Sequence, residues 1–152
     1  MEGSGSPLII PVPLHPSRRR ERGFNQSEML AVGMVRALGK LSGTATPKVV
    51  NSCLQRKRAT PPQTGLSVFA RHENLRGAFE VVKPDAVRQR AIVLIDDVMT
   101  TGATLSACAR ALQRAGAAKV LGLTLARATP QFPDLTRADS DNTVDGLGRD
   151  ST

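Results

Sequence analysis

The stretch AIVLIDDVMTTGAT, residues 91–104, constrains the fold of this chain more than any other part of it. Its first five residues form a continuous apolar run rich in β-branched side chains, which is typical of a strand covered on both faces. Asp96 and Asp97 follow, where such a strand is expected to leave the sheet. Because open α/β sheets bind ligands at the carboxyl ends of their strands, this position predicts a ligand site.

The loop after the aspartates is predicted to bind an anion. It contains three hydroxyl side chains and a glycine, in the order Thr100, Thr101, Gly102, Ala103 and Thr104. An amphipathic helix is expected next, closed by Gly116, with its apolar residues at Leu105, Cys108, Ala109, Leu112 and Ala115. Unpaired N–H groups and the positive end of the helix dipole favour a phosphate at such a loop.

Carboxylates next to a phosphate loop suit a ribose phosphate, because the carboxylates can accept hydrogen bonds from the sugar hydroxyls. The simpler alternative is that Asp96 and Asp97 only end a strand and that the loop only caps a helix. The order of two acids, three threonines and a glycine favours the ligand site. The chain has neither the Gly-Lys-Ser/Thr of a nucleotide phosphate loop nor the G-x-G-x-x-G of a dinucleotide site.

Charge is distributed unevenly along the chain, whose net charge is +8. Residues 128–152 hold five Asp and two Arg, a net −3, so residues 1–127 carry the difference, +11. A body this basic favours a polyanionic ligand, either nucleic acid or a small pyrophosphate. Aromatic residues make up only 3% of the chain, which argues against a base-stacking platform.

An arginine cluster follows the first predicted strand, Leu8–Ile10, which is expected to leave the sheet at Pro11. The segment PSRRRERGFNQ holds Arg18, Arg19, Arg20 and Arg22, with Glu21 among them. Taken alone, it could be a solvated face or a non-specific nucleic-acid patch. Beside a phosphate site, a pyrophosphate clamp is favoured, because the guanidinium fork fits phosphate oxygens.

Further elements are predicted along the chain. Asn25 and Glu28 resemble a capping box at the start of a helix that ends at Gly39 or Gly43. The apolar stripe of that helix is expected at Leu30, Met34, Ala37, Leu38 and Leu41. Residues 48–54, 77–82 and 120–126 are predicted strands, the last of them buried, and residues 83–90 a turn. The polar, proline-rich residues 55–72 are predicted to be either a functional loop or a disordered surface loop without a chemical role.

Several motifs resemble the ComF family of type I phosphoribosyltransferase-like proteins. VLIDDVMTTGATL resembles the phosphoribosyl pyrophosphate signature of type I phosphoribosyltransferases, and PVPLHPSRRRERGFNQSEMLA, RKRATPPQTGLS and ARHENLRGAF resemble ComF segments. The resemblance covers about residues 8–127. It implies an open, mostly parallel twisted sheet flanked by helices, preceded by a disordered linker or cloning remnant at 1–7 and followed by a disordered tail at 128–152. The cysteine-rich zinc-binding segment with which the family commonly begins is not expected here.

The resemblance also implies ligands and roles. Asp96 and Asp97 would bind the ribose hydroxyls as the catalytic pair, and the 5′-phosphate would lie on Val98, Met99, Thr100, Thr101, Gly102, Ala103 and Thr104. Pyrophosphate or hood roles would fall to Arg18, Arg19, Arg22, Gln26, Arg58, Thr60 and Gln63. Mg²⁺ would be carried by the substrate, with no direct protein ligand.

The activity expected from the resemblance is phosphoribosyl transfer, or descent from such an enzyme, within nucleoside metabolism. The acceptor would be an unknown nitrogen-containing nucleophile. The alternative is a non-catalytic module in DNA uptake whose basic face holds single-stranded DNA or a competence protein. A homodimer is compatible with both.

The sequence also predicts the cellular compartment and the state of the two cysteines. No apolar run approaches the ~20 residues of a membrane span, and the first residues do not resemble a signal peptide, so a cytoplasmic protein without a membrane partner is predicted. Cys53 and Cys108 have neither CxxC spacing nor a framework of further cysteines, so both are predicted to be buried free thiols.

Overall fold

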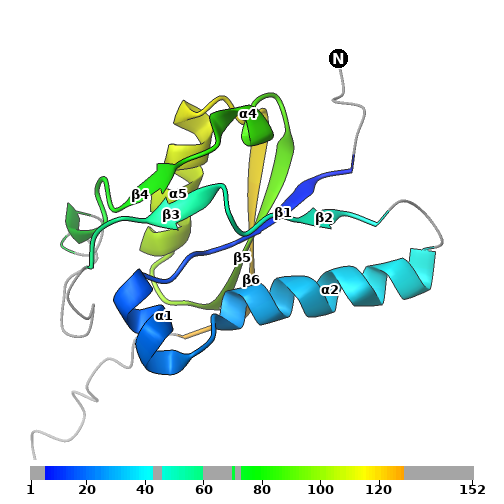
Figure 1. Ribbon diagram of the computed structural model, residues 1–152, viewed down its shortest axis with the longest axis horizontal. Helices are drawn as coiled ribbons and strands as arrows, with labels where there is room; N and C mark the ends of the chain where they lie inside the picture. Colours follow the sequence, from blue (N-terminus) through cyan, green and yellow to red (C-terminus); the bar gives the residue numbers. More distant parts are fainter. Residues whose placement is uncertain (1–5, 43–45, 60–69, 71–72, 129–152) are drawn as a thin grey trace, which may run out of the picture.

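The computed structural model describes residues 6–42, 46–59, 70 and 73–128. Its main sheet has four parallel strands in the order β2-β1-β5-β6, comprising Lys48–Val49, Leu8–Pro11, Ala91–Met99 and Lys119–Arg127. The second sheet pairs β3 (Leu54–Arg56) with β4 (Phe79–Val81) in antiparallel fashion. The helices are α1 (Pro16–Arg22), α2 (Gln26–Ser42), α4 (Pro84–Val87) and α5 (Ala103–Arg114). The prediction of an open parallel α/β sheet flanked by helices is confirmed (Figure 1).

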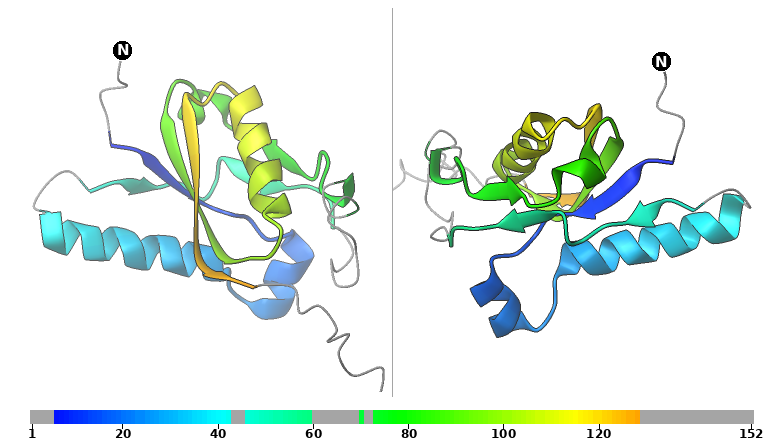
Figure 2. Two further views of the ribbon diagram at one scale, coloured as in Figure 1. Left: turned by 180° about the vertical axis from the view of Figure 1, so that it is seen from behind. Right: turned by 45° about the horizontal axis from the view of Figure 1, so that its top comes forward.

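Two cores lie on opposite faces of the main sheet. Successive side chains of a strand point to opposite faces, so Ile92 and Leu94 of β5 face one side and Ile95 the other. The larger core joins the first face to α5 and to the β3–β4 sheet. The smaller core joins the second face to α2 (Figure 2). Both Cys53 and Cys108 are free and buried in the larger core, as predicted.

Strand β1 extends one residue further than the sequence predicts. Pro11 pairs with Ile95, and the next N–H, that of Val12, donates to the Ile95 carbonyl at 2.8 Å. Proline has no N–H to give to a neighbouring strand. It is tolerated here because the pairing between β1 and β2 ends at Ile9 and Val49, before that N–H would be needed.

The prediction of a single strand at residues 48–54 is wrong. The beginning of this segment is β2, which pairs with β1, and its end is the first residue of β3, which pairs with β4. Between them the Val50 N–H still donates to the Ile9 carbonyl at 2.8 Å, and the chain then leaves the main sheet. Val49 of β2 packs on the smaller core, whereas Val50, Cys53 and Leu54 belong to the larger one, so the switch of sheets is also a switch of cores.

The helical predictions hold in part. Helix α2 continues through Gly39 to Ser42, and Gly43 lies outside the described residues. Its first half packs on the sheet through Ala31, Leu30 and Met34, whereas Leu38 and Leu41 are exposed, the latter by 84%. The predicted stripe is therefore wrong beyond the middle of the helix, because the sheet beneath it ends. The turn predicted at 83–90 contains the short helix α4.

Strand β6 is not the buried strand that the sequence predicts. It is the edge of the main sheet, and its side chains Leu121, Leu123 and Leu125 are 56%, 46% and 76% exposed. Register places Leu121 and Leu123 beside Val93 and Ile95, on the face that α2 covers. Helix α2 packs over β1 and β5, so within the described residues that face of β6 stays open.

Candidate ligand site at the carboxyl edge of the sheet

The connections after β1 and β5 diverge, which makes the carboxyl ends of these two strands the switch point of the sheet. Strand β1 continues through α1 and α2 to β2 on one side, and β5 continues through α5 to β6 on the other. The two long helices cover opposite faces of the sheet. A position where strand order reverses in this way is where open α/β sheets bind ligands.

Asp96 and Asp97 lie at this switch point, although not at the end of their strand as predicted. Strand β5 continues to Met99 because β6 accompanies it, and Met99 is in register with Arg127. On the other side, β1 stops pairing at Ile95. The aspartates therefore have a neighbouring strand on one side only.

The two carboxylates have different surroundings. Asp96 is only 9% exposed, and its Oδ1 accepts hydrogen bonds from Ser27 Oγ at 3.1 Å and from the Asp97 backbone N–H at 3.0 Å. Burial raises the pKa of Asp96 to about 6, and the neighbouring Asp97 charge adds to this, while the Ser27 hydrogen bond opposes it. Asp97 is half-buried. The pair thus offers one buried acceptor and one more accessible carboxylate.

The loop before α5 has the predicted conformation of a helix start. Gly102 is the N-cap with φ 76°, a left-handed conformation that favours glycine. The Ala103 N–H donates to Thr101 Oγ1 at 3.4 Å, and the Ser106 N–H donates to the Gly102 carbonyl at 2.9 Å. Asp96 and this loop border a hollow of about 20 Å³. That volume holds about one water molecule, so a phosphate would need the hollow to widen.

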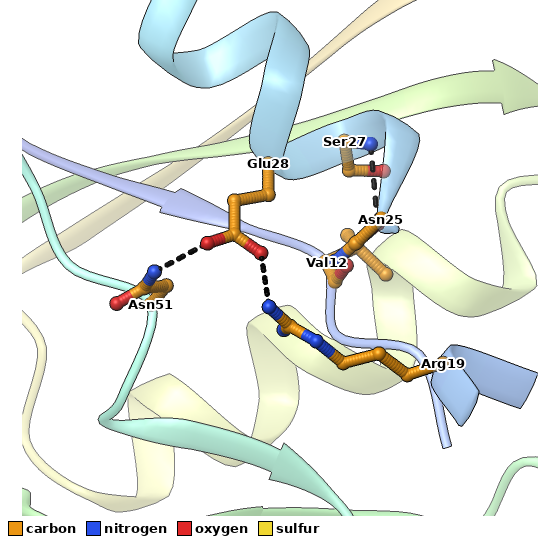
Figure 3. Close-up of polar contacts among 6 residues, drawn as sticks. All are labelled: Val12, Arg19, Asn25, Ser27, Glu28 and Asn51. Atoms are coloured by element: carbon orange, nitrogen blue, oxygen red, sulfur yellow. Dashed lines mark hydrogen bonds and ion pairs between the residues drawn. The ribbon is translucent and has the colours of Figure 1, made fainter. Parts of the chain in front are cut away.

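An arginine-lined cleft of about 540 Å³ lies at the end of β1, between α1 and the segment from Asn51 to Arg56. Its cations are Arg19, Arg20 and Arg56. The Arg19 guanidinium forms an ion pair of 3.0 Å with Glu28, whose other carboxylate oxygen accepts from Asn51 Nδ2 at 2.6 Å (Figure 3). The predicted capping box is therefore only partly right. Asn25 caps the helix, since its Oδ1 accepts from the Ser27 N–H, but the Glu28 side chain bonds to Arg19 and Asn51.

Arg56 lines the cleft, and its pKa also responds to the charge of Asp96. Burial lowers the pKa of its guanidinium, which also lies over the Phe79 ring at 5.5 Å. The nearby charge of Arg18 lowers this pKa further, whereas that of Asp96 raises it. Neither Arg56 nor Asn51 is among the site residues that the sequence predicts. In the sequence, the only feature that could have pointed to Arg56 is its place in a basic run. No feature pointed to Asn51, because it lies inside the predicted strand, at the position where that strand is broken in the structure.

The remaining predicted site residues lie in several different places. Arg22 donates to Gln26 Oε1 at 3.0 Å on the exposed surface where α1 meets α2. Arg58 Nη2 donates to the carbonyls of Asn74 and Arg76 at 2.7 and 3.2 Å, which ties the start of the predicted loop to the residues that follow it. Val98 is exposed and Met99 is partly buried beside Gly102, and both border the hollow next to Asp96. Thr60 and Gln63 lie outside the described residues.

Fold and site together define an open parallel α/β protein with two aspartates at the switch point between β1 and β5 and an arginine-lined cleft at the end of β1. None of the described helices is both long and apolar enough to cross a membrane.

Comparison with known proteins shows which family the chain resembles. Competence protein F of Haemophilus influenzae is 36% identical over 121 residues, which are 79% of this chain and 50% of that protein. DNA utilization protein YhgH of Escherichia coli O157:H7 is 40% identical over 112 residues, 74% of this chain and 45% of that protein. Competence protein ComFC of Bacillus subtilis is 33% identical over 121 residues, 79% and 44% respectively.

The chain is therefore similar to proteins of the competence protein F (ComF) family, which confirms the ComF resemblance seen in its motifs. It spans about half the length of the curated relatives that it matches. No protein-family model matches the chain.

Proposed function

We propose that the chain contributes to DNA uptake or utilization by holding the phosphates of single-stranded DNA in its arginine-lined cleft. The observation that carries this proposal is the gathering of Arg19, Arg20 and Arg56 around a volume of about 540 Å³. Arg56 is partly desolvated there, which strengthens its attraction for an anion. The names of the relatives, competence and DNA utilization, agree with a nucleic-acid role.

Fluorescence anisotropy with a labelled oligothymidylate tests this proposal. Affinity should fall steeply with salt, because each neutralised phosphate of a single strand contributes about 0.7 to the slope of log K against log salt. Arg20→Gln should weaken binding and reduce that slope by about 0.7. Arg114→Gln is the matched control, since Arg114 is exposed in the last turn of α5, whereas it is the first turn of α5 that lies at the carboxyl edge of the sheet.

A slope that does not change between wild type and Arg20→Gln would remove the cleft from the DNA-binding surface. Binding should also persist when Mg²⁺ is removed with a chelator, because arginine–phosphate contacts do not need a cation. Binding that required Mg²⁺ would contradict the proposal.

The second candidate function is binding of phosphoribosyl pyrophosphate, with phosphoribosyl transfer to a nitrogen nucleophile. Asp96 and Asp97 at the switch point favour it, next to a loop that begins a helix. The 5′-phosphate would lie on residues 98–104, the ribose hydroxyls on the aspartates and the pyrophosphate toward Arg18, Arg19 and Arg22. Mg²⁺ would be held mainly by the oxygens of the ligand.

In that reaction a nitrogen lone pair would form a bond to the ribose C1, and the bond from C1 to pyrophosphate would break. The cations of the cleft would stabilise the leaving pyrophosphate. Calorimetry with phosphoribosyl pyrophosphate and Mg²⁺ tests the binding, and pyrophosphate release with nucleobases, ammonia or simple amines tests the transfer. Asp97→Asn should abolish the Mg²⁺-dependent binding, and an unchanged affinity would remove this candidate.

A further inference from the structure

Three polar side chains are buried in the described part of the chain, and they form one chain of hydrogen bonds. Asn25, Ser27 and Asp96 are 6%, 4% and 9% exposed. Asn25 Nδ2 donates to the Val12 carbonyl at 3.0 Å, and the Ser27 N–H donates to Asn25 Oδ1 at 3.2 Å. Ser27 Oγ then donates to Asp96 Oδ1 at 3.1 Å. The other buried side chains of the described residues are apolar or are thiols.

This polar chain closes the segment that carries the arginine cluster. Val12 follows β1, and Asn25 precedes α2, so their hydrogen bond joins the two ends of residues 13–24, which include α1. The bond between Asn25 and Val12 fixes the start of α2. From the first turn of this helix, Ser27 bonds to Asp96 of β5, which is 69 residues further along the chain. The arginine-lined cleft and the Asp96 carboxylate are thus connected through Asn25 and Ser27.

A buried carboxylate needs such donors to stay ionised. Removing a charged group from water is costly, and hydrogen bonds to its charged form offset part of that cost. The charged and titratable groups around Asp96 act in different directions. Asp97 on β5 disfavours its charge, Arg56 on β3 favours it, and the buried Cys108 thiol on α5 has a raised pKa partly because Asp96 is near. Ser27 is the donor that comes from α2.

We propose that Ser27, held in place by Asn25, is a positioning residue that keeps the Asp96 carboxylate ionised and directed to the ligand loop at neutral pH. Asp96 borders the hollow before α5, and Ser27 bonds to its Oδ1. The use of this carboxylate by a ligand rests on the second candidate function. The positioning of Asp96 by Ser27 can be measured in the free protein.

NMR titration of the aspartate carboxyl carbons is the test, with Asp96 assigned through Asp96→Asn. The pKa of Asp96 in the wild type should lie near 6. In Ser27→Ala it should rise by about one unit, because a hydrogen bond to a charged acceptor is lost. Ser27→Thr, which keeps the hydroxyl, should restore the value. Ser106→Ala is the control, since it removes a serine hydroxyl from the first half of α5, whereas the donor to Asp96 comes from α2.

Calorimetry with phosphoribosyl pyrophosphate and Mg²⁺ between pH 5 and pH 8 is the second readout. In Ser27→Ala the pH below which binding is lost should shift upward together with the pKa of Asp96, which a merely structural role would not cause. If Ser27→Ala changes only the stability and leaves the titration of Asp96 unchanged, the inference is overturned. If the wild type binds no ligand at any pH, the second candidate function fails, and the NMR titration alone still accepts or rejects the positioning role. Should Ser27→Ala not fold, Asn25→Ser is the replacement variant, because it loosens Ser27 without removing its hydroxyl.

Discussion

The Glu28 carboxylate lies 3.0 Å from the Arg19 guanidinium, so the first turn of α2 already supplies an anion to the arginine-lined cleft. The Glu28 side chain is 22% exposed and is also held by Asn51. A DNA phosphate that approaches Arg19 must therefore share the guanidinium with Glu28 or displace it. Glu28 sets an internal limit on the affinity of the cleft for anions.

We therefore expect Glu28→Gln to bind single-stranded DNA more tightly. The removed carboxylate competes for Arg19 with an energy of up to about 1 kcal/mol, which corresponds to a gain of about two- to fivefold at low salt. Fluorescence anisotropy measures this gain. Glu73→Gln breaks the comparable exposed pair between Glu73 and Arg76 and should leave the affinity nearly unchanged. Equal gains in both variants would show an effect of net charge alone.

Asp96 should make the protein less stable at neutral pH than at acidic pH. Its folded-state pKa is raised from 3.8 to about 6, so the folded state favours the protonated carboxyl. This contribution to stability is fully present below pH 4 and is lost as the pH rises through 6. The difference corresponds to roughly 3 kcal/mol when each pKa unit is converted at 1.36 kcal/mol.

Asp96→Asn should accordingly stabilise the fold at pH 8 by about 1–3 kcal/mol and change little at pH 4. The asparagine oxygen can still accept from Ser27 Oγ and from the Asp97 N–H, so the local hydrogen bonds survive. Urea denaturation at both pH values measures the effect. Asp85→Asn is the control, because Asp85 is an exposed residue of α4. A loss of stability at pH 8 would show that the Asp96 carboxylate is well compensated by its surroundings.

Sequence predicted the parts of this protein in which local pattern and tertiary role agree. Residues 91–95 are apolar without a break because both faces of β5 are covered, and Gly102 precedes a helix because the left-handed turn favours glycine. The arginine cluster was recognised because its charge is concentrated in a few residues. These features depend on neighbours in the chain, so sequence alone was sufficient.

The errors arise where distant segments decide the outcome. Residues 120–126 have the composition of a buried strand, but whether a face is covered depends on the reach of α2, which the strand itself does not encode. The break between β2 and β3 depends on which core each strand reaches: Val49 packs on the smaller core and Leu54 in the larger one, a choice that the residues between them do not encode. Ser27 looked like an ordinary residue of a helix start, and only the fold brings it to Asp96.

The open face of β6 predicts a contrast between two leucines. Leu94 on β5 is fully buried, so Leu94→Ala should cost about 2–5 kcal/mol through lost contacts and a cavity. Leu125 is 76% exposed, so Leu125→Ala should change the free energy of unfolding by about 0.5 kcal/mol or less. Urea denaturation compares the two variants. A cost above about 2 kcal/mol for Leu125→Ala would mean that this face of β6 is covered in solution.

The conformation of Gly102 gives the sharpest test of the loop before α5. Its φ of 76° disfavours any side chain with a Cβ, and a Cβ at this position would meet only Met99 Sδ at 3.6 Å, an ordinary contact. Gly102→Ala should therefore lose about 1–2 kcal/mol through backbone strain and not through a clash. Gly77→Ala is the matched control, because Gly77 has φ 68° and no atom within 4 Å of its Cβ position. Both variants should lose similar stability in urea denaturation, but only Gly102→Ala should weaken Mg²⁺-dependent binding of phosphoribosyl pyrophosphate in calorimetry. If the two variants bind this ligand equally well, the loop takes no part in holding its phosphate.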